Sequence, residues 1–304
     1  ALEQPAMYHL ATPLVDEPIV LDDEGGRYWK PQNADKKFRG QVPLSQALIE
    51  SLNVPSVNLG MALGLENIAD TLRRLGIKTQ VKLVPALTLG AFELSLVQVN
   101  QMYQTIANNG RYRPLRAVNA ITSSNNRLLW KHSDYAELRV DEAATYLTNY
   151  ALHKVTVDGT ARRIRQLYPQ TNMAGKTGTT DDYRDSWFAG FDRNILVTTW
   201  MGNDDNNKTG LTGASGALSA FTAYQQLQEP KSLSRRFPEG LGIAHFNPKT
   251  GEVMVPGCKN AMSVPAILDV LPPARVDCSG KVAAPKPPPK EEKKRSWWER
   301  IFGG

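Results

Sequence analysis

The chain has 304 residues, of which 41% are hydrophobic and 22% charged, and 36 Lys and Arg against 30 Asp and Glu give a net charge of +6. This composition excludes a collagen-like chain, a wholly disordered chain and a disulfide-dense miniprotein. No apolar run approaches the roughly 18 residues of a membrane-spanning helix. Because the first residues contain neither an initiator Met nor an apolar signal segment, we expect a longer parent protein, in which any anchor or export signal would precede Ala1.

The positive charge is concentrated at one end of the chain. Residues 281–304 hold seven Lys and Arg and three Glu, so they supply +4 of the net charge. The +2 left on the other residues is too small for a phosphate-binding surface, which excludes nucleic acid as a partner. The Pro-rich, charged tail is predicted to be disordered. Its aromatic end, Trp297-Trp298, leaves open a weak contact with a membrane surface or a partner.

The first half of the chain predicts mainly helices. Residues 14–30 predict an extended hairpin, since short apolar runs flank an acidic turn that contains two glycines. A helix is expected to begin near Pro43, and a second helix, after an interruption at Pro55, to run toward Gly64. Apolar side chains at helical spacing predict further helices over 66–75, 94–108 and 141–156. A second hairpin is expected over 116–131, and a turn at Gly159-Thr160-Ala161.

The second half changes to a strand pattern. We predict strands over 173–179, 186–191 and 195–201, and a last helix over about 214–227. Since helices precede and follow antiparallel strands, the predicted fold class is α+β. We expect three parts: a main domain over 1–228, a small loop-rich extension over 229–280 and the tail over 281–304.

The two cysteines, Cys258 and Cys278, stand twenty positions apart in the loop-rich extension. Two isolated cysteines do not make a zinc site, so they form either a disulfide or two reduced thiols, and an exported protein favours the disulfide. The four histidines share no ligand spacing. We therefore expect neither a metal site nor a cofactor.

The segment Lys176-Thr177-Gly178-Thr179 lies on the first of the predicted strands. An edge strand of this composition offers a fixed cation, two hydroxyls and backbone N–H groups. Gly178 lacks a side chain, so a second backbone can lie close to the strand. The segment suits an extended peptide whose carboxylate is held by Lys176 and the threonines, with the Thr179 N–H as an oxyanion donor. The alternative is an ordinary polar turn between strands.

The segment Ser51-Leu52-Asn53 lies at a predicted helix end, just before Pro55. One interpretation is a C-terminal cap followed by a new helix. The functional interpretation gives Ser51 a hydroxyl that relays a proton and Asn53 an amide that binds a substrate peptide group.

The two segments occur in the order of the S-D-N and K-T-G elements that, with S-x-x-K, mark serine β-lactamases and penicillin-binding proteins. Their surroundings, over 51–60, 175–180 and 185–190, resemble a bifunctional (class A) penicillin-binding protein. Residues 29–33 and 58–65 and the late cysteine pair resemble its 1B branch. The resemblance covers about 14–280. It implies a serine β-lactamase/D,D-transpeptidase-like fold with an antiparallel sheet flanked by helices.

The resemblance also implies a function. It implies a D,D-transpeptidase that cross-links peptidoglycan stem peptides by serine acyl transfer, with β-lactams acylating the same serine. The implied catalytic residues are Ser51, Asn53, Lys176 and Thr179, and the implied substrate-binding residues are Asn53, Thr177, Gly178 and Thr179. The implied parent is also a glycosyltransferase, anchored at the periplasmic face of the bacterial inner membrane, where cell-wall synthesis regulators are possible partners.

The chain departs from the family pattern at one essential element, because none of its serines has Lys three residues later. We expect the S-x-x-K segment to precede Ala1 and the chain alone to be inactive. One alternative is a non-catalytic module that binds stem peptides. A β-lactamase is a weaker alternative, because no loop between Ser51 and Lys176 matches the one that carries its deacylating Glu.

Overall fold

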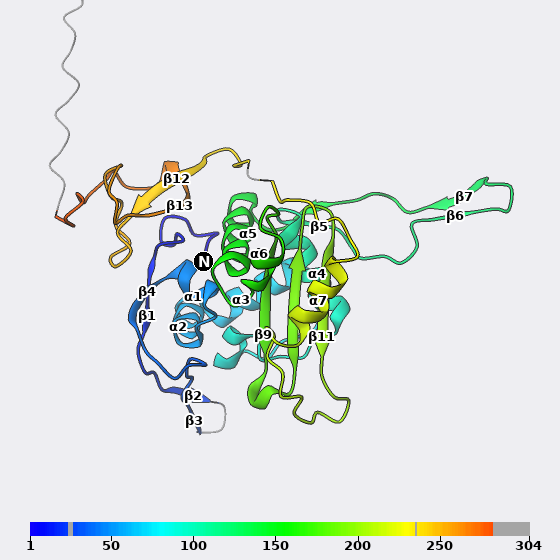
Figure 1. Ribbon diagram of the computed structural model, residues 1–304, viewed down its shortest axis with the longest axis horizontal. Helices are drawn as coiled ribbons and strands as arrows, with labels where there is room; N and C mark the ends of the chain where they lie inside the picture. The colour runs from blue at the N-terminus through cyan, green and yellow to red at the C-terminus, as the bar shows by residue number, and fades with distance from the viewer. Residues whose placement is uncertain (24–26, 235, 282–304) are drawn as a thin grey trace, which may run out of the picture.

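The computed structural model describes residues 1–23, 27–234 and 236–281. At its centre lies a three-stranded antiparallel sheet in the order β11-β10-β9. The strands are β9 (Ala174–Thr179), β10 (Ser186–Phe191) and β11 (Leu196–Met201). Helix α4 (Leu96–Ala107) packs on one face of the sheet, α7 (Ala217–Gln225) on the other, and α5 (Glu142–Val157) against β9 (Figure 1). The α+β class and the three strands are confirmed.

Successive side chains of β10 point to opposite faces of the sheet, and buried apolar side chains occur on both faces, which explains why helices cover both. Phe188 is fully buried and contacts Phe221 of α7 with ring centroids 4.8 Å apart. On the opposite face, the buried Phe191 shares a cluster with Tyr103 and Ile106 of α4. In register with β10, Lys176 and Gly178 of β9 lie on the α4 face of the sheet, whereas the two threonines lie on the α7 face.

The N-terminal region combines two short strand pairs with three helices. Strand β1 (Pro13–Asp16) pairs with β4 (Gly40–Pro43), and β2 (Leu21–Asp23) with β3 (Arg27–Trp29). The hairpin expected over 14–30 is therefore wrong for its first residues, because β1 pairs with β4, which follows the hairpin in the sequence. The helices are α1 (Leu44–Ile49), α2 (Asn53–Leu63) and α3 (Leu65–Arg74), followed by a 3-10 turn, η1 (Pro85–Leu89).

Local sequence signals account for the helix ends. Pro43 precedes α1 and two helices follow as expected, but the break between them lies at residues 50–52 and not at Pro55, which occupies the first turn of α2, where no intrahelical N–H is needed. Ser95 and Gln98 form a capping box at α4, and Asp141 caps α5. A short helix, α6 (Arg163–Leu167), and a 3-10 turn, η2 (Asp181–Tyr183), complete the central region.

A long arm leaves the body between α4 and α5 (Figure 1). At its base, β5 (Arg111–Tyr112) pairs with β8 (Glu137–Leu138), and at its far end β6 (Ala120–Thr122) pairs with β7 (Leu128–Lys131). The hairpin expected over 116–131 is confirmed. No helix in the part of the chain that the structure describes is long and apolar enough to cross a membrane.

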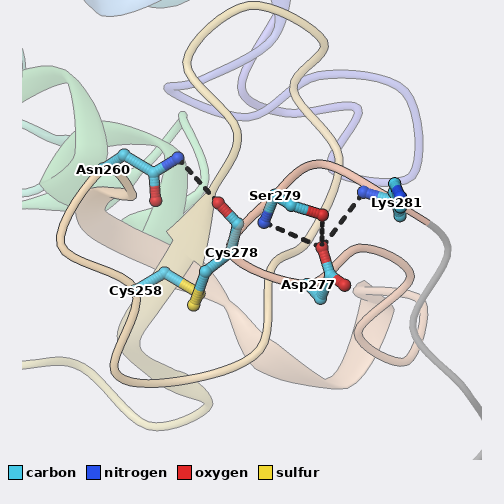
Figure 2. The surroundings of a disulfide bond; sticks show 6 residues. All are labelled: Cys258, Asn260, Asp277, Cys278, Ser279 and Lys281. Carbon is cyan, nitrogen blue, oxygen red and sulfur yellow. Dashed lines mark hydrogen bonds between the residues drawn. A yellow bond between two sulfur atoms is a disulfide. The ribbon is translucent and has the colours of Figure 1, made fainter.

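The C-terminal region is a strand pair and a disulfide loop. Strand β12 (Leu241–Phe246) pairs with β13 (Met262–Ile267), which leads into η3 (Leu268–Val270). Their buried side chains share a core with residues of β1, α1 and α5. Cys258 and Cys278 form a disulfide, beside which Asn260 donates to the carbonyl of Cys278 (Figure 2). The expected boundary at 228 stays a prediction, and the tail beyond 281 lies outside the described residues.

Candidate active site

Ser51 forms the corner between α1 and α2. Its φ of +58° places it in the left-handed region, where glycine and asparagine are the usual residues after a helix end. The Leu52 N–H donates to Ala47 O at 2.8 Å, which closes the end of α1. The cap interpretation of this segment is therefore correct. A serine in this conformation is strained by about 1–2 kcal/mol, and that strain marks the position as a functional candidate.

The Ser51 hydroxyl is held by Lys176. The Lys176 ammonium donates to Ser51 Oγ at 2.7 Å and to the Thr177 carbonyl at 2.9 Å. The side chain leaves β9 on the α4 face of the sheet, in a half-buried position. Desolvation by burial lowers the pKa of Lys176 from 10.5 to about 8. The two segments singled out in the sequence thus meet through a cation that can give up its proton near neutral pH.

Asn53 lies close in sequence but binds elsewhere. It is the first residue of α2, and its side-chain amide donates to the Gln32 carbonyl at 2.8 Å. The neighbouring Asn33 accepts from the Val54 N–H at 3.1 Å and donates to the buried carboxylate of Asp16 at 2.7 Å. These bonds hold the loop after β3 against the start of α2. The structure therefore brings Ser51 to Lys176 and directs the Asn53 amide to a backbone carbonyl of this loop.

The two threonines of β9 lie on the opposite face from Lys176. The buried Thr177 hydroxyl shares a 2.6 Å hydrogen bond with the hydroxyl of Thr160, in the turn after α5. The exposed Thr179 accepts a hydrogen bond from the Gly213 N–H at 2.9 Å. Sequence reasoning found the 159–161 turn but not its contact with the site. The pair Gly159-Thr160, a turn glycine followed by a hydroxyl side chain, was the sequence signal that could have pointed to this contact.

A second backbone lies against Gly178 on the α7 face of the sheet, opposite to the face where Gly178 lacks a side chain, so the expected approach of a peptide to that face stays a prediction. A Cβ on Gly213 would stand 2.6 Å from Gly178 O and 2.9 Å from Gly178 N. The segment that approaches is therefore the loop before α7. A Cβ on Gly178 itself would meet Trp187 Cβ at 3.1 Å, which is a milder contact.

A cavity of about 810 Å³ opens beside Lys176, between the α4 face of the sheet and the segment 89–103. Its walls are mainly apolar: they include Leu96, Val99, Met102, Trp187 and Trp200. One edge is polar and runs along Lys176–Thr180. Asp185 holds this edge in place, because it accepts from Trp200 Nε1 at 2.9 Å and from the Thr180 hydroxyl at 3.0 Å.

Sequence reasoning did not identify the 89–103 wall of this cavity, because its apolar side chains read only as one face of a helix. Among the residues that the structure describes, no group of three or more His, Cys, Asp and Glu side chains is arranged to hold a metal ion. The reactive groups that the structure brings together at the site are the Ser51 hydroxyl, the Lys176 amine of lowered pKa and the polar groups of β9.

The sequence profile described as "Penicillin binding protein transpeptidase domain" matches residues 15–228, which include both Ser51 and the β9 segment. The chain belongs to this family. The sheet, the helices on its two faces and the cavity all lie within the matched residues or at their edge.

Curated relatives of the family carry the name penicillin-binding protein 1B. The protein of that name from Vibrio cholerae is 41% identical over 266 residues, which cover 87% of this chain and 34% of the relative. The Escherichia coli protein is 42% identical over 214 residues, which cover 69% of this chain and 25% of the relative. A penicillin-binding protein 1A from Aquifex aeolicus is 33% identical. The resemblance to the 1B branch is confirmed, and the chain spans about a third or less of these relatives.

Solved structures of penicillin-binding proteins share the fold. The crystal structure of penicillin-binding protein 1A from Haemophilus influenzae superposes with a TM-score of 0.80 at 23% identity, covering 89% of this chain and 47% of that one. PonA1 from Mycobacterium tuberculosis, in complex with penicillin V, superposes with a TM-score of 0.64 at 22% identity, covering 78% of this chain and 68% of that one. The transpeptidase-like fold is therefore confirmed.

Proposed function

We propose that this chain is part of a serine D,D-transpeptidase that cross-links peptidoglycan stem peptides and is acylated by β-lactams. The observation that carries the proposal is the 2.7 Å hydrogen bond from Lys176 to Ser51 at the edge of a large cavity. The relatives named penicillin-binding proteins and the neighbour bound to penicillin V support it.

The nucleophile of the proposed reaction is a serine of an S-x-x-K segment outside these 304 residues. The chain itself has no such element. The apolar cavity between α4 and the sheet is a suitable seat for a helix that carries it, because such a helix would cover Leu96 and Trp200 and bring its serine to Lys176. On this proposal residues 1–304 alone do not react with penicillin.

The proposed reaction has two steps. The serine oxygen forms a bond to the penultimate D-alanine carbonyl, the peptide C–N bond breaks, and the serine proton leaves on the terminal D-alanine amine. An amine of a neighbouring stem peptide then forms a C–N bond to the same carbonyl, the ester C–O bond to the serine breaks, and the proton lost by the amine returns to the serine oxygen. Ser51 Oγ and Lys176 Nζ are placed to relay these protons, since their atoms already share a hydrogen bond and burial lowers the pKa of Lys176 to about 8.

The remaining residues are proposed to bind the substrate. At the edge of β9, Lys176 and Thr179 would hold its carboxylate, Thr177 would join them by exchanging its bond to Thr160, and the Thr179 N–H would donate to the oxyanion. Gly178 would allow the peptide backbone to approach β9, and Asn53 would bind a peptide group by exchanging its bond to Gln32. β9 pairs only with β10 in the described part of the chain, so its other edge has room for a peptide strand.

We further propose that the parent protein is bifunctional, with a peptidoglycan glycosyltransferase part, and acts at the periplasmic face of the bacterial inner membrane. The Cys258–Cys278 disulfide supports an oxidising compartment.

Labelling with fluorescent penicillin tests the proposal. The protein made from the whole reading frame should be labelled at the serine of its S-x-x-K segment, and residues 1–304 should not. Lys176→Ala in the longer protein should reduce the acylation rate by orders of magnitude, because the relay and the carboxylate would lose their cation. Stoichiometric acylation of residues 1–304, or near-normal acylation of the Lys176 variant, would contradict it. Calorimetry with a D-Ala-D-Ala peptide distinguishes the transpeptidase from the alternative, a non-catalytic binding module. If the chain is such a module, residues 1–304 bind the peptide without reacting with it.

A further inference from the structure

The arm between α4 and α5 ends in a hairpin whose apolar side chains have no cover. Ile121 is 50% exposed, Leu129 55% and Trp130 45%. Trp130 stands opposite Ile121, and Leu129 is its neighbour in the strand, so apolar groups occupy both faces of the ribbon. A single two-stranded ribbon is marginally stable in water, and both of its outer edges carry unpaired backbone groups.

The base of the arm is anchored firmly. Strands β5 and β8 pair there, and the Arg139 guanidinium lies 3.6 Å above the ring centroid of Tyr112. Asp134 forms ion pairs with Arg113 at 3.2 Å and Arg116 at 3.4 Å. These contacts join the two segments at the base of the arm, and the ribbon projects away from the body (Figure 1). An arm held in this way suits a fixed contact with another structural element.

We infer that the hairpin β6–β7 is a docking site for an extended, acidic segment of the longer parent polypeptide, which adds to the ribbon as a further strand. This inference rests on the proposed function, which places the nucleophile outside these 304 residues. The matched part of the relatives is only 34% and 25% of their length, so most of such a polypeptide is available to reach the arm. Being tethered, it would act at a high effective concentration.

Charge identifies the chemistry of the occupant. Within residues 119–133 the hairpin carries Arg127 and Lys131 and no Asp or Glu, whereas Arg113 and Arg116 at the base are paired with Asp134. A strand that alternates apolar side chains with Asp or Glu would cover one face and neutralise this charge. A second copy of the arm would bring like charges together, which disfavours self-pairing. A bilayer fits poorly, because the turn at 123–126, Ser-Ser-Asn-Asn, is polar and stands at the far end of the ribbon.

Site-specific photo-crosslinking tests the inference in the protein made from the whole reading frame. A benzophenone amino acid at Ile121 or Leu129 should crosslink to one segment of the same polypeptide outside residues 1–304, and that segment should carry more Asp and Glu than Lys and Arg. The control position is Ile243 of β12, which is 48% exposed and should give no such product. Crosslinks to a second copy, another protein or lipid, crosslinks to a basic segment, or none at all would overturn the inference.

Hydrogen exchange gives a second, independent measurement. The amides of 120–131 should exchange at least tenfold more slowly in the longer protein than in residues 1–304. Leu129→Lys should abolish this protection and leave the melting temperature of residues 1–304 unchanged, whereas Ile243→Lys should not affect it. Equal exchange in the two proteins would overturn the docking, while penicillin labelling of the longer protein would still report the proposed function separately.

Discussion

The Lys176 ammonium donates a 2.7 Å hydrogen bond to Ser51 Oγ, across 125 positions of sequence. One partner extends from an edge strand of the sheet, and the other occupies a left-handed corner between two helices. The bond therefore fixes the helical region against the sheet at the margin of the cavity.

Ser51 should tolerate glycine better than alanine. Both substitutions remove the hydroxyl that Lys176 contacts, but only glycine adopts a φ of +58° without strain. Ser51→Gly is expected to be more stable than Ser51→Ala by about 1 kcal/mol, as measured by urea unfolding of residues 1–304. In the longer protein both variants should lose acylation to a similar degree. Equal stability of the two variants would show that the backbone at this corner is not strained.

Lys176 should titrate near pH 8. In residues 1–304 labelled with 13C-lysine, the Cε resonance of Lys176 is identified as the one missing in Lys176→Arg. The chemical shift of this resonance should change with pH with a midpoint at about pH 8, because burial disfavours the ammonium. Ser51→Ala should lower the midpoint further, since the ammonium loses an acceptor. Between about pH 8 and 10.5 the unfolded chain binds the proton that the folded chain has released, so the free energy of unfolding should rise with pH over this window. In Lys176→Met this rise should be absent, and an unchanged slope would contradict the lowered pKa.

Most of the fold could be predicted because its signals are local. The helix over 94–108 and the strands over 173–201 follow from periodicity, turn residues and caps, and the structure places them within a few residues. The first hairpin could not be assigned in full, because β1 pairs with β4 and the strands β2 and β3 lie between them in the sequence. Which strand β1 pairs with depends on tertiary packing. The break between the first two helices was expected at Pro55 but lies a few residues earlier, because a proline is also tolerated in the first turn of a helix.

The site was predictable in its residue types but not in its contacts. The structure joins Ser51 directly to Lys176, whereas Asn53 binds Gln32 and Thr177 binds Thr160. These two bonds join segments whose proximity follows only from the packing of α1, α2 and α5 around β9. The catalytic and binding roles of these residues stay predictions. The cavity wall over 89–103 was missed because apolar side chains at helical spacing are typical of any core-facing helix.

Thr160 should matter to stability through its hydroxyl. It shares a 2.6 Å hydrogen bond with the buried Thr177 hydroxyl, and Thr160→Val would leave that group without a partner. The expected loss is about 1–3 kcal/mol in the free energy of unfolding. Thr160→Ser keeps the hydroxyl and should retain most of the stability, so the pair of variants separates the hydrogen bond from packing. A loss as large for Ser as for Val would assign the effect to the methyl group.

Opening the disulfide should destabilise the C-terminal loop. Cys258 and Cys278 are separated by 20 positions, and a loop of this length is stabilised by about 3 kcal/mol through restriction of the unfolded state. Cys258→Ser with Cys278→Ser should therefore accelerate hydrogen exchange around Met254 and Val276, which pack beside the disulfide. The amides of the central sheet serve as the internal control. Unchanged exchange around Met254 would show that the small cluster holds this loop without the crosslink.

The contact between Gly213 and Gly178 should be sensitive to a methyl group on one side only. In Gly213→Ala the new Cβ would lie 2.6 Å from Gly178 O, and a backbone atom cannot move away without displacing β9. In Gly178→Ala the Cβ would meet Trp187 Cβ at 3.1 Å, which a small shift of the side chain relieves. Gly213→Ala is therefore expected to lower the free energy of unfolding by about 1–3 kcal/mol, and Gly178→Ala by clearly less. If Gly178→Ala nevertheless reduces penicillin acylation of the longer protein, the lack of a side chain at 178 serves the substrate rather than the fold. If Gly213→Ala unfolds no more readily than Gly178→Ala, the loop before α7 does not fix the edge strand.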